Sequence, residues 1–339
     1  MPDAVYQFSG ILPVLRPRSC VRIPLVNKSR PFFLIFLSLL LFVSLGFSET
    51  SRALIELEER DRPVLKDSPW GQYWRFAPLG KISNILVVVH GTVEENQKAA
   101  DLAGQFINRW MEYARSEHLL VLSPAFDKLD YQGPYGGYRG LFGRKCGADE
   151  FVNNLVDLYR SCVKNDSGRF LLYGHSAGGQ FAGRYLVRHP NRLGAVVLSA
   201  PGRYAFPDPN VPWPYGMGRI KRTMKWSKMD IHQIDIQPDP EGWLKAACVP
   251  VSVVVGEKDL EPQPARPGQK GKNRVEIASH WIKDMRDLAR KNGKSPNLRS
   301  VIVHGAGHSS TALTPACQKE MSSIMKKDKK TPGKSDPAP

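Results

Sequence analysis

The feature that most constrains the fold of this 339-residue chain is a short segment in which a serine lies between two glycines. Residues 174–178 read Gly-His-Ser-Ala-Gly, with Ser176 at the centre. An apolar run over residues 170–173 precedes the segment, and apolar residues at helical spacing follow it over residues 177–188. This order predicts a strand, a tight turn that needs small residues, and a helix. We therefore expect the hydroxyl of Ser176 to stand clear of a buried sheet.

Short apolar runs alternate with longer amphipathic stretches along much of the chain. This pattern is typical of a mostly parallel, doubly wound sheet with helices on both faces, so the predicted fold class is α/β. Near-continuous leucine and β-branched residues favour strands that are buried on both faces. We expect strands at 85–89, 119–122, 170–173, 195–198, 251–255 and 301–303, and helices at 94–116, 148–163, 177–188, 275–292 and 312–326.

The first 48 residues form a basic region that ends in an apolar segment at 31–47 without charged side chains. Basic residues before such a segment, with Glu49 after it, favour translocation of the chain that follows. The segment is long for the core of a signal peptide and barely long enough for a membrane span. We therefore expect a periplasmic or extracellular domain. Cleavage near Ser48, as a signal peptide, and retention in the membrane, as a signal anchor, both stay open.

Residues 49–68 are charged and compatible with a helix, and we interpret them as a spacer before a folded domain at 69–325. Inside that domain, residues 128–147 are rich in glycine and tyrosine and predict a long loop. Residues 201–247 combine prolines, tryptophans and basic side chains, and form a candidate partial cap insertion over a site. The lysine- and proline-rich tail at 326–339 is expected to be disordered.

The net charge of the chain is +16 at pH 7, and basic residues at both ends contribute to it. Because no nucleic-acid-binding motif accompanies this charge, no nucleic-acid partner is expected. Four cysteines follow the apolar segment, and the sequence leaves open whether they form disulfides. A bond between Cys146 and Cys162 is disfavoured because a helix between them would hold them about 20 Å apart. No CxxC or histidine-rich cluster predicts a metal site.

Acyl transfer by Ser176 would need a base, a group that orients the base, and donors for an oxyanion. The expected base is His308, in a glycine-containing loop after the last strand; His304, at the end of that strand, is expected to be structural. The expected orienting acid is Asp259, just past the preceding strand, with Glu257 as the local alternative.

Two backbone amides are expected to bind the oxyanion. One belongs to Ala177, at the N-terminus of the predicted helix, where the helix dipole favours negative charge. The other belongs to Thr92, in the loop after the strand at 85–89, where Gly91 allows the backbone to turn sharply. His90 in the same loop is expected to brace it.

Four motifs together resemble the α/β-hydrolase superfamily: residues 90–92 (His-Gly-Thr), 174–179, 256–259 (Gly-Glu-Lys-Asp) and 307–308 (Gly-His). The order serine, aspartate, histidine is that of these hydrolases. Residues 148–157 are similar to the poly(3-hydroxybutyrate) depolymerase and feruloyl esterase-like group of exported bacterial enzymes. Dienelactone hydrolases are neighbours, but their nucleophile is cysteine.

The resemblance implies a serine hydrolase that cleaves carboxylic esters, in small molecules or polymers, through an acyl-enzyme and without a cofactor or metal. Ser176 would be the nucleophile, His308 the base and Asp259 its orienting acid. If the N-terminal segment is not cleaved, the membrane is a further partner. Two alternatives remain, which are a serine peptidase of the same fold and a surface protein that binds without catalysis.

Overall fold

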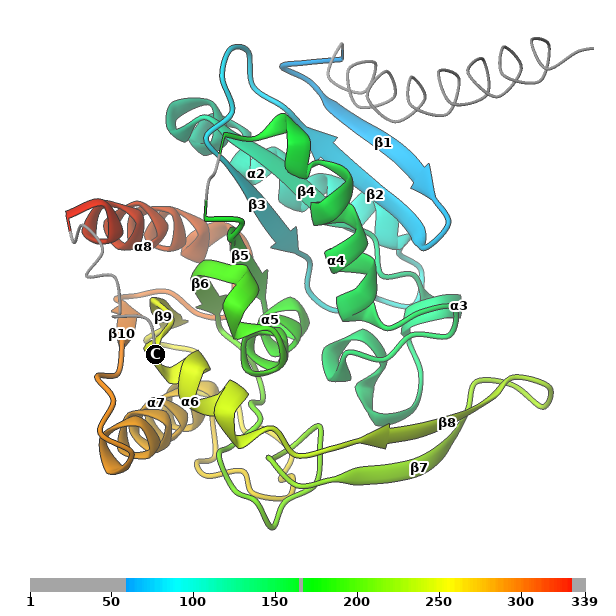
Figure 1. Cartoon of the computed structure of the whole chain (residues 1–339), viewed down its shortest axis with the longest axis vertical. Coiled ribbons are helices and arrows are strands. Elements are labelled where there is room, and N and C mark those ends of the chain that lie inside the picture. Colours follow the sequence, from blue (N-terminus) through cyan, green and yellow to red (C-terminus); the bar gives the residue numbers. More distant parts are fainter. Residues whose placement is uncertain (1–58, 165–166, 331–339) are drawn as a thin grey trace, which may run out of the picture. The chain divides into compact units, whose positions relative to one another are not determined.

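The computed structural model describes residues 59–164 and 167–330, and an eight-stranded sheet lies at the centre of this part. Its strands are β1 (Pro63–Ser68), β2 (Gly71–Phe76), β3 (Asn84–Val89), β4 (Leu119–Pro124), β5 (Phe170–His175), β6 (Leu193–Ser199), β9 (Val251–Gly256) and β10 (Leu298–Val303). They lie side by side in the order β1-β2-β4-β3-β5-β6-β9-β10 (Figure 1). β2 pairs antiparallel with β1 and β4, and the other pairs are parallel.

Both faces of the sheet are buried, as the near-continuous apolar runs predict. In β3, Ile85, Val87 and Val89 enter one core, and Leu86 and Val88 enter the other, because successive side chains of a strand point to opposite faces. The helices that fill the first core are α4 (Ala148–Leu158), α5 (Ala177–Arg188), α6 (Pro240–Cys248) and α7 (Arg274–Lys291). The second core is covered by α2 (Ala99–Glu117) and α8 (Ser310–Lys330).

The predicted α/β fold is confirmed, and each predicted strand and helix overlaps one of these elements. The observed helix boundaries differ from the expected ones by a few residues. The helix expected at 94–116 begins only at Ala99, and the helix expected at 148–163 ends at Leu158, before a 3-10 turn at Arg160–Cys162. The loop expected at 128–147 contains two short helical turns, α3 (Lys128–Tyr131) and η1 (Pro134–Gly140).

Two boundaries expected from composition differ from the structure. The last six residues of the expected spacer form β1, which pairs with β2 along its whole length. The side chains of Leu65 and Asp67 are exposed, as on the outermost strand of a sheet. The polar residues of this segment therefore belong to the solvent-facing side of an edge strand. At the other end, α8 continues to Lys330, into the segment expected to be disordered, because lysine is a good helix former.

The predicted signal peptide or anchor at 1–48 lies outside the described residues, as does the remainder of the predicted tail. No helix within residues 59–164 and 167–330 combines the length and the apolar character that crossing a membrane requires. No disulfide joins any two of the four cysteines in this described part, which are Cys146, Cys162, Cys248 and Cys317.

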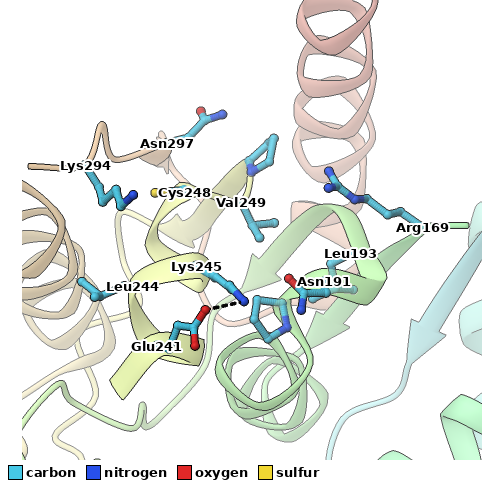
Figure 2. Close-up of a pocket in the computed structure, with 12 residues that line it drawn as sticks. Arg169, Asn191, Leu193, Glu241, Leu244, Lys245, Cys248, Val249, Lys294 and Asn297 are labelled. Carbon is cyan, nitrogen blue, oxygen red and sulfur yellow. Dashed lines mark ion pairs between the residues drawn. The ribbon is translucent and has the colours of Figure 1, made fainter. Parts of the chain in front are cut away.

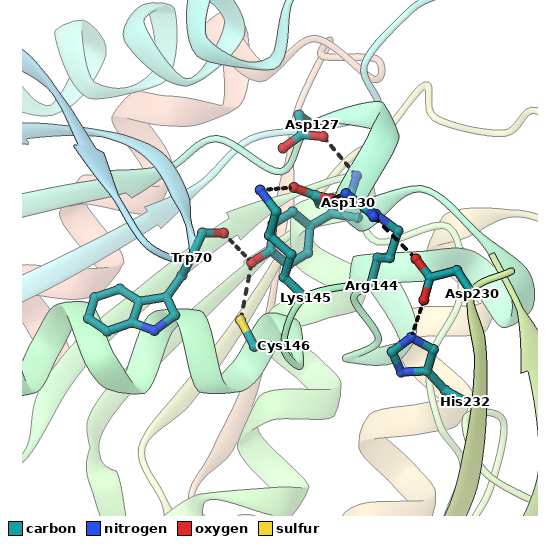
Figure 3. Close-up of polar contacts among 9 residues, drawn as sticks. Trp70, Asp127, Asp130, Arg144, Lys145, Cys146, Asp230 and His232 are labelled. Carbon is teal, nitrogen blue, oxygen red and sulfur yellow. Dashed lines mark hydrogen bonds and ion pairs between the residues drawn. The ribbon is translucent and has the colours of Figure 1, made fainter. Parts of the chain in front are cut away.

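The candidate cap segment contains a hairpin of β7 (Ile220–Lys225) and β8 (Ile231–Ile236), which forms a two-stranded sheet of its own (Figure 1). The side chain of Arg144 fastens the hairpin tip to the preceding loop, with Nε 2.8 Å from Asp130 Oδ1 and Nη1 3.2 Å from Asp230 Oδ2 (Figure 3). Trp226 packs directly on Gly133 in the same loop. The segment is therefore docked on residues 128–147, and its role as a partial cap over the site stays a prediction.

Candidate active site

The site lies where β3, β5, β9 and β10 end. These strands are parallel, so the loops that follow them meet at one edge of the sheet, which is where α/β proteins form their sites. Each of these four loops carries one of the motifs found in the sequence.

The backbone at Ser176 is strained, with φ 52° and ψ −112°, a conformation that residues other than glycine seldom adopt. A Cβ atom at Gly174 would collide with the carbonyl of Gly178, and one at Gly178 would collide with the carbonyl of Val89. The glycines are therefore required by close backbone approach. The Ser176 amide donates to Ser199 O at 2.8 Å, which fixes the turn to β6.

The structure brings the hydroxyl, the imidazole and the carboxylate of the three predicted residues into one hydrogen-bonded chain. His308 Nε2 lies 3.0 Å from Ser176 Oγ, and His308 Nδ1 lies 2.7 Å from Asp259 Oδ2. The carboxylate side chain is 1% exposed, whereas the imidazole is one-third exposed. A buried carboxylate on Nδ1 selects the tautomer whose Nε2 can accept a proton from the serine.

Asp259 is held by a second partner, since Arg274 Nη1 lies 2.8 Å from its Oδ1. Burial acts to raise the pKa of Asp259, but the hydrogen bond and charge of His308 and the guanidinium of Arg274 outweigh it. The net result is a pKa below the usual value. The carboxylate is therefore ionised at neutral pH.

His304 and Glu257, the alternatives considered for the base and the orienting acid, form a separate pair. His304 Nδ1 lies 3.2 Å from Glu257 Oε1, and Glu257 Oε2 accepts a hydrogen bond from the amide of Gly305 at 2.9 Å. The side chain of His304 is 88% exposed. This pair links the loops after β9 and β10, which is the structural role expected of His304.

The loop after β3 is braced as expected. The amide of Phe126 donates to His90 Nε2 at 3.0 Å, so the proton of this imidazole is on Nδ1, which donates to Gly91 O at 2.7 Å. Burial lowers the pKa of His90 to about 4, against an opposing effect of the hydrogen bond to Gly91. The hydroxyl of Tyr138 donates to the same carbonyl at 2.8 Å.

This bracing also orients the next amide. In a trans peptide the C=O and N–H groups point in opposite directions, so the Thr92 N–H points away from His90 and Tyr138. A Cβ atom added at Gly91 would lie 3.7 Å from Ser176 Cβ, which places this loop against the serine. The amide of Ala177 is in the first turn of α5, where N–H groups have no partner within the helix.

The ring of His175 packs at a tilt against the imidazole of His308, with 5.1 Å between the ring centroids. Burial, and secondly the charge of His308, lower the pKa of His175 to about 3, so the ring is neutral at neutral pH. Its Nδ1 lies 3.0 Å from Ser199 Oγ. A neutral ring can pack on His308 without opposing a positive charge there.

Sequence reasoning missed three residues of this arrangement. Tyr138 could have been suspected from the glycine- and tyrosine-rich loop, and His175 from its place in the motif. No signal identified Arg274, which begins α7 and meets Asp259 only in the folded chain.

One surface pocket, with a volume of about 490 Å³, lies elsewhere (Figure 2). Leu193, Pro250 and Asn297 line it, at or just before the starts of β6, β9 and β10, so it opens at the edge of the sheet opposite the site. Lys245 in this pocket is paired with Glu241 at 2.7 Å. In the part of the chain that the structure describes, no group of three or more His, Cys, Asp or Glu side chains could hold a metal ion.

No protein-family model and no curated protein matches the sequence. Solved structures do match. LpqC, a poly(3-hydroxybutyrate) depolymerase from Bordetella parapertussis, is 20% identical, with a TM-score of 0.60 over 78% of this chain and 86% of that one. Poly(aspartic acid) hydrolase-1 from Sphingomonas sp. KT-1 is 21% identical, with a TM-score of 0.58 over 76% of this chain and 97% of that one. The chain therefore has the α/β-hydrolase fold, as its four motifs predict.

Proposed function

We propose that this protein is a serine hydrolase that cleaves carboxylic esters through an acyl-enzyme. The observation that carries the proposal is the hydrogen-bonded chain from Ser176 through His308 to Asp259, with distances of 3.0 and 2.7 Å. Ser176 lies at a strained turn, and α5 begins directly after it, so the first amides of α5 lie beside the serine. This combination supports nucleophilic catalysis better than binding alone, because a binding surface needs no base beside a strained serine.

In the first half of the reaction, His308 Nε2 removes the proton of Ser176 as Oγ attacks the ester carbonyl carbon. The carbonyl oxygen becomes an oxyanion that accepts hydrogen bonds from the amides of Thr92 and Ala177. The imidazolium then gives its proton to the alkoxide, and the alcohol leaves while the acyl group stays on Ser176.

In the second half, water replaces the alcohol. His308 Nε2 takes a proton from water as the oxygen attacks the acyl-enzyme, and the same two amides stabilise the second oxyanion. Collapse of this intermediate returns the proton to Ser176 Oγ and releases the acid. Asp259 keeps the imidazole in the reactive tautomer and stabilises its charged form, while Arg274 keeps the carboxylate ionised and in place.

Hydrolysis of a polymer is within this proposal. One similar solved structure is a depolymerase of a polyester, and the other is a hydrolase of poly(aspartic acid), which is joined by amide bonds. The same triad can cleave either bond. The resemblance of residues 148–157 to the esterase-like group favours the ester, and peptide turnover without ester turnover would contradict that choice.

A fluorophosphonate probe and p-nitrophenyl butyrate test the proposal. We expect the probe to label Ser176, and we expect Ser176→Ala to lose both labelling and ester turnover. Ser279→Ala, in an exposed position on α7, is the control and should retain both. Ester turnover that persists in Ser176→Ala would refute the assigned nucleophile.

We also propose that the chain is exported, on the basis of the basic region and the apolar segment at 31–47 that precede the folded part. Fractionation of cells that express the full chain, followed by an alkaline wash of the membranes, tests this proposal. Release with a new N-terminus near residue 49 would indicate a cleaved signal peptide. A cytoplasmic, full-length protein would contradict export.

A further inference from the structure

Four arginines gather beside the candidate site. Arg203 follows the end of β6 and is half-buried, Arg139 belongs to η1, and Arg266 lies in the loop before Arg274 and α7. Burial lowers the pKa of Arg203, and the next causes are the charges of Arg266 and Arg139, with a further contribution from Arg274. The charges of the three other arginines therefore act on the guanidinium of Arg203.

The loop that carries Arg203 lies against two residues that adjoin the proposed triad. A Cβ atom added at Gly202 would lie 3.6 Å from Arg274 Nε and 3.7 Å from Gln180 Nε2. Gln180 is in the first turn of α5, and its amide donates to Ser176 O at 3.0 Å. Arg274 in turn holds Asp259. The backbone next to Arg203 thus lies beside two residues, Gln180 and Arg274, that are hydrogen-bonded to the serine and to the acid of the proposed triad.

The backbone of Arg139 is held by a buried cation. Arg184 on α5 is 2% exposed, and its Nη1 donates to Arg139 O at 3.0 Å and to Gln180 O at 3.2 Å. Its Nε donates to Pro214 O at 2.7 Å, in the candidate cap segment. Arg184 therefore ties the backbone of Arg139 and the cap segment to α5, the helix that follows Ser176.

In the part of the chain that the structure describes, three of these charges have no carboxylate partner. Arg274 is paired with Asp259 and, at 3.4 Å, with Glu261. By contrast, none of the ion pairs formed within residues 59–164 and 167–330 includes Arg139, Arg203 or Arg266. The Nε of Arg203 is buried and makes no hydrogen bond there. Holding like charges together costs free energy, and an anion bound between them would offset that cost. The planar guanidinium group is suited to carboxylates, which it binds through two hydrogen bonds.

We propose that Arg139, Arg203 and Arg266 form a carboxylate-binding subsite that selects substrates with an anionic group near the ester that Ser176 attacks. The inference deepens the proposed esterase function and rests on it. The substrate class is therefore an ester with a free carboxylate on its acyl or its alcohol part.

Matched pairs of charged and neutral esters test the subsite. Monoethyl adipate against ethyl adipamate places the carboxylate on the acyl part, and 4-carboxyphenyl butyrate against 4-carbamoylphenyl butyrate places it on the alcohol part. We expect kcat/KM to be about tenfold higher for the anionic member of at least one pair, as a charge-assisted hydrogen bond provides. The preference should weaken as salt is added.

Substitution of the arginines identifies their contribution. Arg203→Gln and, separately, the exposed Arg266→Gln should bring the ratio of the two kcat/KM values toward one, and the second variant covers a failure of the first to fold. Arg290→Gln, an exposed position on α7, removes the same charge and should keep the wild-type ratio. A wild-type ratio near one for both pairs would overturn the inference, as would a ratio that neither substitution changes.

Calorimetric titration of Ser176→Ala with adipate separates the subsite from the esterase function. Adipate binding that Arg203→Gln abolishes in this background supports the subsite even if the protein hydrolyses no ester. Failure to bind adipate, in a protein that also hydrolyses no ester, overturns the subsite as well. Ester turnover without any anionic preference leaves the esterase proposal intact and overturns the subsite alone.

Discussion

The two oxygens of Asp259 have different partners: Oδ2 is 2.7 Å from His308 Nδ1, and Oδ1 is 2.8 Å from Arg274 Nη1. The carboxylate is thus held from both sides, with its negative charge shared between a base that must become cationic and a permanent cation. Removing one partner leaves a buried carboxylate with half of its hydrogen bonds.

Replacing Arg274 by Gln should lower the free energy of unfolding at pH 7 by about 2 kcal/mol, because a charge-assisted hydrogen bond to a buried group is lost. The pKa of Asp259 is lower in the folded than in the unfolded protein. Its ionisation therefore stabilises the fold above the unfolded pKa, and this stabilisation is lost as the pH falls through the folded value. The difference between wild type and variant should consequently shrink at acidic pH.

Urea unfolding of wild type, Arg274→Gln and Arg274→Lys at pH 7 and near pH 3 measures this effect. The lysine variant retains the charge and should recover part of the loss. An equal difference between wild type and Arg274→Gln at both pH values would argue that Arg274 acts through packing alone.

Adding a single methyl group at a glycine tests whether the turn at Ser176 requires close backbone approach. Gly178→Ala should destabilise the protein by about 2 kcal/mol or more and abolish ester turnover, since the new Cβ would collide with the Val89 carbonyl. Gly183→Ala lies in the same helix, and its Cβ would meet only Leu198 Cδ1, at 3.7 Å. It should be neutral or stabilising by up to about 1 kcal/mol. Thermal unfolding and activity of the two variants check the contrast, which similar losses in both would contradict.

How far these features could be predicted depends on whether the signal is local. Residues 85–89 are apolar at every position and indicate a strand without further context. Likewise, the five residues 174–178 are sufficient to predict the tight turn at Ser176. The site residues on separate loops could be predicted because each follows a recognisable strand, and parallel strands end at a common edge.

The remaining features depend on contacts between distant residues. β1 presents exposed Leu65 and Asp67, so its composition is that of a spacer until β2 is beside it. The β7–β8 hairpin is largely exposed and charged, and it is held by the pairing of Arg144 with Asp230 across 86 residues. Arg274 meets Asp259 for the same reason. Such partners are chosen by tertiary packing, which a local pattern does not encode.

His175 makes the stability of the fold depend on pH. Because burial lowers its pKa to about 3, the unfolded chain binds a proton near pH 6.5 that the folded chain does not. Above pH 6.5, this group therefore leaves the free energy of unfolding unchanged. Below pH 6.5, it lowers the free energy of unfolding by about 1.4 kcal/mol for each pH unit. His175→Phe keeps an aromatic ring but removes this proton uptake, so its unfolding free energy should fall less steeply between pH 6 and 4. Urea unfolding across that range compares the two slopes, and parallel slopes would contradict the assignment.

The cooperation of Ser176 with His308 is the centre of the account, and a double-mutant cycle on p-nitrophenyl butyrate turnover tests it most directly. Ser176→Ala and His308→Ala should each lower kcat by about 10³-fold or more, and the double variant should lose no more than either alone, because the two residues act as one unit. His304→Ala, whose exposed side chain pairs with Glu257, is the control and should stay within about twofold of wild type. Turnover near the wild-type level in His308→Ala, or losses that multiply in the double variant, would contradict the account.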